Sequence, residues 1–381
     1  MRRHRFRFVT VILALAMPPQ LLALLDLSRA LSAGGHAAVA AALPWAMLAC
    51  NLPLLVVFAR RRIPKGALGE VLLVPFSVSG IGSLVYLPLA AVLHGAHALG
   101  APMPAWWVFA SPFALIAYGA FIGQRWMRPE RVEVPVEGLP ESLRGLKLVH
   151  LSDLHLGGFV SDARLRRIAR HAAKLGGDAV VVTGDIVDRD ASHARRAGEI
   201  LASIPAPLGV YACLGNHDHY AGARKVAADL TAAGVTVLMN RGARLGRGGN
   251  SIWLCGIDDI SFGGHDLDAA LAGRPAGMPA VLLSHNPNFF PVAARAGVAL
   301  TLSGHTHGGQ FGVLWLHRAL SLARLITRYV AGLYNIGASH LYVSRGAGLV
   351  MPLRVGARPE VTLLELVPAQ TPHEAAEPVV A

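Results

Sequence analysis

The feature of this sequence that most constrains its fold is a set of short apolar runs that each end in polar side chains. Residues 180–188 read VVVTGDIVD, in which the apolar run predicts a buried strand and Asp185 follows its carboxyl end. Four further runs end in the same way, in the sequences DLH, GNHD, SH and GHTH. Because open α/β sheets bind ligands at the carboxyl ends of their strands, we expect these side chains to gather in one site.

The residue types in these segments predict a metal centre. Seven of them are candidate ligands: Asp153, His155, Asp185, Asn216, His285, His305 and His307. Carboxylate, amide and imidazole donors without thiolate suit Mn, Fe or Zn. Seven donors exceed one tetrahedral site and suit two divalent ions that share a carboxylate and that clamp the oxygens of a displacement reaction.

The segment that contains His217 predicts acid–base chemistry beside the ions. His217 is the candidate proton donor, and Asp218 is expected to hold its imidazole. Asp188, three residues after Asp185, is expected to orient a ligand or His217. For Arg189 a local ion pair is preferred to direct contact with phosphate.

The first third of the chain has a different composition. Residues 1–131 carry 12 Lys and Arg against 3 Asp and Glu, whereas the remainder carries 23 against 20, so the net charge of +12 is not a nucleic-acid footprint. Four apolar runs, at about 8–28, 37–59, 71–93 and 105–124, each reach the ~20 residues of a membrane-spanning helix. Eleven basic residues flank them on one side against Arg29 on the other, which predicts a multi-pass inner-membrane protein whose second domain faces the cytoplasm.

The chain thus divides into a transmembrane region at 1–128, a linker at 129–145, a soluble domain at 146–367 and a disordered tail at 368–381. Alternating strands and helices in the soluble domain predict βαβ units. Residues 311–333 mix apolar residues with Arg318, Arg324 and Arg328. They are predicted to form a helix that packs on the domain, with a lid that touches lipid as the alternative.

The five motifs together, in this order, resemble the calcineurin-like metallophosphoesterase superfamily. The stretches GHTHGGQ, RYVAGLY, LYVSRGAG and RPEVTLLEL are similar to its bacterial membrane-associated YkuE/YaeI-like branch. The resemblance covers about residues 145–367 and implies a four-layer α/β/β/α sandwich, preceded here by a four-helix transmembrane region. It implies one metal on Asp153, His155, Asp185 and His307, and a second on Asp185, Asn216, His285 and His305. His217 would then act on the leaving or phosphoryl oxygen, with Asp218 behind it.

The predicted function is that of a membrane-anchored, dinuclear metal-dependent phosphoesterase. It would hydrolyse a phosphodiester or pyrophosphate bond by attack of a metal-bridging hydroxide. Tethering to a bilayer, and relatives that cleave UDP-diacylglucosamine, favour a lipid-linked substrate, with membrane lipids as the only other expected partner and no obligate protein partner. One alternative is a broad-specificity phosphodiesterase on soluble nucleotides.

A second alternative is a membrane protein that senses metal or nucleotide without turnover. The intact His217 argues against it. So does the expectation that the spans lack paired charges, because Asp26 and Glu70 lie near span ends that water can reach.

Overall fold

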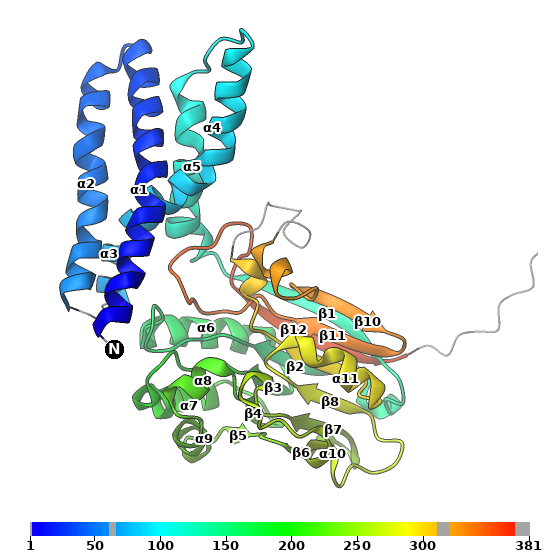
Figure 1. Cartoon of the computed structure of the whole chain (residues 1–381). Helices are drawn as coiled ribbons and strands as arrows, with labels where there is room; N and C mark the ends of the chain where they lie inside the picture. Colours follow the sequence, from blue (N-terminus) through cyan, green and yellow to red (C-terminus); the bar gives the residue numbers. More distant parts are fainter. Residues whose placement is uncertain (1, 61–65, 311–320, 370–381) are drawn as a thin grey trace, which may run out of the picture. The chain divides into compact units, whose positions relative to one another are not determined.

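The computed structural model describes residues 2–60, 66–310 and 321–369 of the chain, which divides into two compact units (Figure 1). One unit comprises Met1–Arg125 with Met351–Val355, and the other comprises Trp126–Val350 with Gly356–Ala381. The second unit holds every residue of the predicted metal centre.

Two six-stranded sheets form the second unit. The first sheet has the order β1-β12-β2-β3-β4-β5 and the second has the order β10-β11-β9-β8-β7-β6. The strands of the first sheet are β1 (Arg128–Val136), β12 (Glu360–Pro368), β2 (Leu146–Leu151), β3 (Ala179–Thr183), β4 (Val210–Cys213) and β5 (Thr236–Val237). Those of the second are β10 (Gly332–Ile336), β11 (Ser339–Val343), β9 (Leu300–Ser303), β8 (Ala280–Leu283), β7 (Asn250–Gly256) and β6 (Arg241–Arg247). The central strands β2, β3 and β4, and likewise β7, β8 and β9, run parallel.

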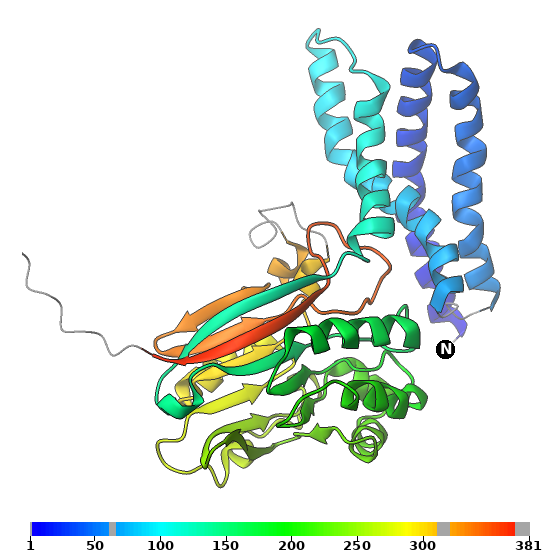
Figure 2. The same cartoon turned by 180° about the vertical axis from the view of Figure 1, so that it is seen from behind.

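Three apolar cores hold the sheets and helices together as four layers. One core lies between the sheets, where Leu148 of β2 and Val281 of β8 belong to the same buried cluster. A second core joins the first sheet to helices α6 (Asp162–Leu175), α7 (Ala194–Ala202) and α9 (Ala223–Ala232), as the view from behind shows (Figure 2). A third joins the second sheet to α10 (Leu267–Leu271) and α11 (Phe290–Arg295). This is the α/β/β/α arrangement that the family resemblance implied.

Helix α6 shows how local sequence sets these elements. Ser161 caps its start by accepting a hydrogen bond from the backbone N–H of Arg164 at 3.3 Å. Gly176 ends it in the left-handed conformation at φ 67°. Leu165 and Ile168 on its apolar face pack in the core against the sheet.

The predicted linker at 129–145 is wrong for its first half. Arg128–Val136 forms β1, which pairs with β12 along its full length from Arg128↔Glu360 to Val136↔Pro368. The strand was overlooked because its sequence, RPERVEVPV, alternates charge with apolar residues and contains two prolines, as edge strands do. The last strand likewise extends to Pro368, and residues 370–381 of the predicted tail lie outside the described residues.

The segment predicted as one helix at 311–333 is partly described. Residues 311–320 lie outside the described residues, and from Ser321 the chain forms a 3-10 turn at Leu322–Leu325 and then enters β10. A single packed helix is therefore wrong for the described part. The hydroxyl of Thr327 accepts a hydrogen bond from the backbone N–H of Tyr329 at 3.1 Å, an arrangement that competes with helix. Gly332, a few residues later, also disfavours a continuous helix.

The first unit is helical. Its helices are α1 (Arg2–Ala33), α2 (Ala37–Arg60), α3 (Gly66–Phe76), α4 (Gly82–Ala98) and α5 (Trp106–Tyr118), with π-helical turns at Ser77–Ile81 and Gly119–Gly123. Each predicted span falls on helix. By length and composition two helices among the described residues can cross a membrane, Val71–Ala98 and Trp106–Gly123, and Ala37–Pro53 is a shorter apolar helix. The four-span region stays a prediction.

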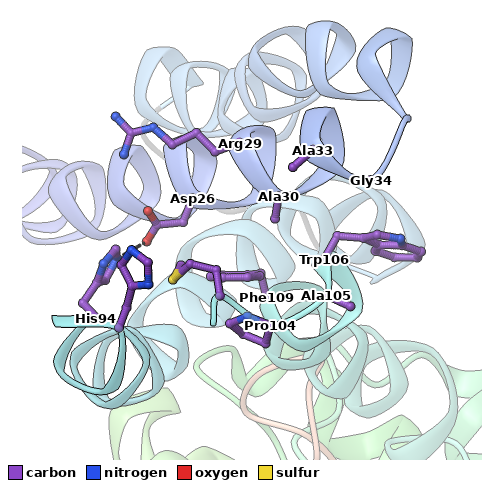
Figure 3. Close-up of a pocket in the computed structure, with 12 residues that line it drawn as sticks. Asp26, Arg29, Ala30, Ala33, Gly34, His94, Pro104, Ala105, Trp106 and Phe109 are labelled. Carbon is purple, nitrogen blue, oxygen red and sulfur yellow. Dashed lines mark hydrogen bonds and ion pairs between the residues drawn. The ribbon is translucent and has the colours of Figure 1, made fainter. Parts of the chain in front are cut away.

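Asp26 departs from its predicted place in water. Its side chain is buried, accepts a hydrogen bond from the Tyr86 hydroxyl at 2.6 Å and lies 2.8 Å from Nε2 of His94. Asp26 and His94 border a cavity of about 560 Å³ that Arg29 and Trp106 also line (Figure 3). Asp26 therefore has polar partners that the sequence did not predict, because they come from α4, some 60 residues away in sequence.

The β1 assignment predicts a stability effect. Val134 is fully buried between the sheets, whereas its neighbour Glu133 is exposed on the other face of the strand. We expect Val134→Ala to lower the free energy of unfolding of this unit by about 2 kcal/mol through the cavity it leaves. Glu133→Ala, the matched control, should change it by less than about 0.5 kcal/mol. Urea titration measures the free energy of unfolding of both variants. Equally small effects of the two substitutions would contradict the assignment of this segment as a packed strand.

Candidate metal centre

The structure brings all seven candidate ligands to one edge of the sandwich. Asp153 and His155 follow β2, Asp185 follows β3, and Asn216 follows β4, three neighbouring strands of the first sheet. His285 follows β8, and the pair His305 and His307 follows β9, neighbours in the second sheet. Both sheets therefore contribute ligating side chains from their carboxyl ends.

One cluster of donor atoms surrounds Asp153 and His307. Oδ1 of Asp153 lies 3.3 Å from Nε2 of His307, and that nitrogen lies 3.2 Å from Nε2 of His155. Nε2 of His155 lies 3.6 Å from Oδ2 of Asp185. All four side chains are buried, so their donor atoms face one another and not solvent.

A second cluster lies on the other side of Asp185. Nε2 of His285 is 3.3 Å from Oδ2 of Asp185 and 3.2 Å from Nδ1 of His305. The carbonyl oxygen of Thr183 lies 2.7 Å from Nδ1 of His285, so Nδ1 carries a proton and donates a hydrogen bond to this carbonyl. The other ring nitrogen, Nε2, faces Asp185. Oδ1 of Asn216 is buried and has no hydrogen-bond partner among the described residues. Oδ2 of Asp185 thus faces both clusters.

The backbone at these positions is held in an unusual conformation. Asp153, His155, Asp185, His305 and His307 all have φ between 50° and 70°, the left-handed region that non-glycine residues seldom adopt. The adjoining glycines leave no room for a side chain. A Cβ on Gly215 would lie 2.3 Å from Oδ1 of Asp185, and one on Gly304 would lie 1.8 Å from Oγ of Ser152. Strained residues that gather in one place are typical of functional sites.

The protonation of the cluster suits a cation. Burial raises the pKa of Asp153 to about 6. Burial also acts to raise that of Asp185, but the positive charges of His285 and His155 outweigh it and hold the pKa well below its usual range. Burial lowers the pKa of His155 and of His305 to about 4. At neutral pH Asp185 is therefore an ionised carboxylate, and His155 and His305 are neutral imidazoles, the forms that bind metal.

The pKa of His285 depends mainly on burial and on Asp185. Burial lowers its pKa, but the negative charge of Asp185 and the hydrogen bond to it outweigh burial and raise the pKa to about 10. Without a cation, His285 therefore carries a proton that balances the Asp185 carboxylate, and a divalent cation bound to Nε2 would replace that proton. The unpartnered Asn216 oxygen and the facing nitrogens show that these residues fit divalent cations.

His217 lies beside the clusters, and Asp188 is the residue that orients it. Nδ1 of His217 is 2.9 Å from Oδ1 of Asp188, and the His217 ring is 4.5 Å from that of His155. The prediction that Asp218 holds this imidazole is wrong. The Asp218 carboxylate is buried and accepts the backbone N–H groups of Ile186, Val187 and Gly215 at 3.0 Å each.

The chain also contains residues near the centre that sequence reasoning left without a role. Asp259 is buried, its Oδ2 has no hydrogen-bond partner among the described residues, and its charge raises the pKa of His285. Oδ1 of its neighbour Asp258, which is also buried, lies 2.7 Å from Nε2 of His219. An Asp-Asp pair is common in solvated loops, so only the fold shows that these two carboxylates are buried.

The segment Ser344–Gly348 holds the loop that contains Asp153 through backbone hydrogen bonds. Backbone N–H groups of Ala347 and Gly348 donate to the carbonyls of Ser152 and Asp153 at 3.0 and 2.9 Å. The buried guanidinium of Arg345 pairs with Glu130 of β1 and Glu360 of β12. The edge strand β1 therefore connects to the first donor cluster through this arginine.

A cluster of buried oxygen and nitrogen donors at the ends of central strands in a two-sheet sandwich defines a metal-binding α/β protein. The family profile described as calcineurin-like phosphoesterase matches residues 146–309. The chain is 32% identical over 263 residues to the uncharacterized metallophosphoesterase YkuE of Bacillus subtilis, covering 66% of this chain and 92% of that protein. The chain belongs to the calcineurin-like metallophosphoesterase family.

Two further relatives describe the range of the family. Phosphodiesterase YaeI of Escherichia coli is 33% identical over 225 residues, which cover 58% of this chain and 82% of that protein. A transmembrane protein with metallophosphoesterase domain from Danio rerio is 38% identical over 250 residues, 62% of this chain. The match spans 56% of the length of that relative. Family membership supports a metal-dependent hydrolase as the class of enzyme.

The different placement of the two carboxylates predicts different stability effects. Asp218→Ala should lower the free energy of unfolding of the metal-free protein by at least about 3 kcal/mol, because three buried N–H groups lose their acceptor. Asp188→Ala removes one hydrogen bond from a partly exposed carboxylate and should cost about 1–2 kcal/mol. Urea unfolding measures both. A loss at Asp218 no larger than that at Asp188 would contradict the assigned roles.

Proposed function

We propose that this chain is a membrane-anchored phosphoesterase that hydrolyses a phosphodiester or pyrophosphate bond with two divalent cations. The observation that carries the proposal is the position of Asp185, whose Oδ2 lies 3.6 Å from His155 and 3.3 Å from His285. Asp153, His155, Asp185 and His307 would hold one ion of Mn, Fe or Zn, and Asp185, Asn216, His285 and His305 the other. When bound, such ions supply an ionised water as nucleophile and positive charge at the phosphoryl oxygens.

The residues around the ions position the substrate and move a proton. Asp188 occupies Nδ1 of His217, so Nε2 is the nitrogen that can protonate the leaving oxygen. Burial lowers the pKa of His217, but the hydrogen bond to Asp188 and the charge of Asp185 outweigh it and raise the pKa above its usual value. The raised pKa favours the protonated form of His217, the form that a general acid needs. Asp185 also accepts the His217 backbone N–H at 2.8 Å, which fixes the general acid relative to the ions.

A membrane location supports a lipid-linked substrate such as UDP-diacylglucosamine. Two helices can cross a membrane, and a relative is named as a transmembrane protein. In the domain unit, Leu325 and Ile326 are 83% and 68% exposed, between Arg324 and Arg328. Apolar side chains flanked by arginines suit a membrane surface. In this proposal the protein is multi-pass in the inner membrane and its domain faces the cytoplasm. A phosphodiesterase for soluble nucleotides is the alternative.

Metal content tests the shared ligand. Protein stripped of metal and dialysed against Mn should retain about two ions per chain by elemental analysis. Asp185→Ala should retain fewer than about one, because both clusters lose a donor. Asp229→Ala removes a carboxylate that pairs with Lys225 on the helix surface and serves as the control. A mutant that keeps the wild-type metal content would contradict the sharing of Asp185.

Turnover tests the proton donor. The detergent-purified chain should hydrolyse bis-p-nitrophenyl phosphate only after metal is resupplied. His217→Ala should lower kcat by about 10²-fold or more while the metal content is unchanged. His171→Ala, on helix α6, is the control. A comparison of this substrate with UDP-diacylglucosamine shows which of the two is preferred. If neither is hydrolysed with any metal, the proposal that the chain is a phosphoesterase is rejected. An unchanged kcat in His217→Ala would reject the role of His217 alone.

A further inference from the structure

Two exposed aromatic side chains lie beside His217 and have no part in the chemistry described above. Tyr220 is 55% exposed and Phe262 is 46% exposed. The Tyr220 ring lies 5.4 Å from the His217 ring and 5.6 Å from the Phe262 ring, in edge-to-face arrangements of 66° and 70°. We call Tyr220 and Phe262 the aromatic platform. The platform lies directly beside His217, the proposed proton donor.

The platform is fixed by its surroundings. His219 stacks on Phe262 with ring centroids 4.5 Å apart and planes 11° from parallel. Nε2 of His219 is in turn 2.7 Å from Oδ1 of the buried Asp258. Tyr220 stands on the short helix α8 (Asn216–Ala221), which also carries Asn216 and His217, so its position relative to the metal centre is set by the same turn of backbone. Two large rings are therefore held in place although about half of their surface faces solvent.

Positive charge lies next to the platform. The guanidinium carbon of Arg189 is 5.6 Å from the centre of the Tyr220 ring. Arg189 follows Asp188, the residue that orients His217, and its side chain is exposed. Arg189 therefore lies over an aromatic ring, a contact that the sequence did not predict, and its charge also acts on the neighbouring Asp188. A ligand on the platform meets apolar ring surface and a cation together.

We propose that the aromatic platform binds the planar base of a nucleoside phosphoester whose phosphorus lies at the metal centre. Stacking on aromatic side chains suits every nucleobase, because each has a π face. The cations that the adjoining metal centre would hold, together with Arg189, would suit the phosphate that accompanies the base. The inference rests on the proposed function and narrows its substrate to nucleotides, whether free or linked to a lipid. An acyl chain on the same rings is the competing occupant.

The test compares three phosphate monoesters that differ in what they present to the platform: uridine 5′-phosphate, ribose 5-phosphate and dihexanoyl phosphatidic acid. Calorimetry gives the Kd of each for the full-length, Mn-loaded chain in detergent. Wild type should bind uridine 5′-phosphate about tenfold or more tightly than ribose 5-phosphate. Tyr220→Ala and Phe262→Ala should each bring this ratio down severalfold toward one and leave the Kd of ribose 5-phosphate unchanged. Tyr220→Phe keeps the ring and should keep the ratio.

Ile336→Ala, an apolar side chain of similar exposure on β10, is the matched control and should alter no Kd. Equal affinities of the wild-type protein for uridine 5′-phosphate and ribose 5-phosphate would overturn the proposal. So would alanine variants that weaken both alike, or that weaken dihexanoyl phosphatidic acid alone, since the rings would then bind an acyl chain. Hydrolysis of bis-p-nitrophenyl phosphate by the same samples reports on the proposed function separately. Base-dependent binding without hydrolysis would keep the platform and reject the enzyme.

Discussion

The structure depends on one constraint, the close approach of two buried carboxylates and four imidazoles, three of them buried and that of His305 half-buried. Imidazole nitrogen atoms lie 3.2 Å apart in two places, with the Asp185 carboxylate between them. Divalent cations would satisfy these donors together, since each donor contributes a lone pair to a common centre. Five of the donors also hold left-handed backbone at a cost of order 1 kcal/mol each, which the surrounding sandwich must offset.

The sandwich can impose this arrangement because its parts reinforce the strand ends from several directions. Asp218 ties the loops after β3 and β4 together through three backbone N–H groups. The segment after β11 donates to the Asp153 loop, and Arg345 within it pairs with glutamates of β1 and β12. Strands at the edge of the sheet, which carry no ligand, thereby stabilise the ligand loops. Support of this kind fixes the geometry before any ion arrives.

The sequence predicted what depends on local pattern. The central parallel strands are buried on both faces and appear as unbroken apolar runs, as in AVVVT at β3, so their ends were placed correctly and the candidate ligands lie together. The edge strands β1, β6 and β10 were overlooked, because sequences such as RGARLGR carry charge and glycine. The sequence offered both Asp188 and Asp218 as partners of His217, and only the fold decides between them. Asp218 follows His217 directly, yet the imidazole is held by Asp188, some 29 residues earlier.

The most direct test of the two-cation centre is anomalous diffraction from crystals of the Mn-loaded protein. We predict two peaks about 3.5–4 Å apart, with the Asp185 carboxylate between them. Asp153, His155 and His307 should surround one peak, and Asn216, His285 and His305 the other. A single ion, or ions bound away from Asp185, would contradict the account. In that case the facing imidazoles and the strained backbone would need another explanation.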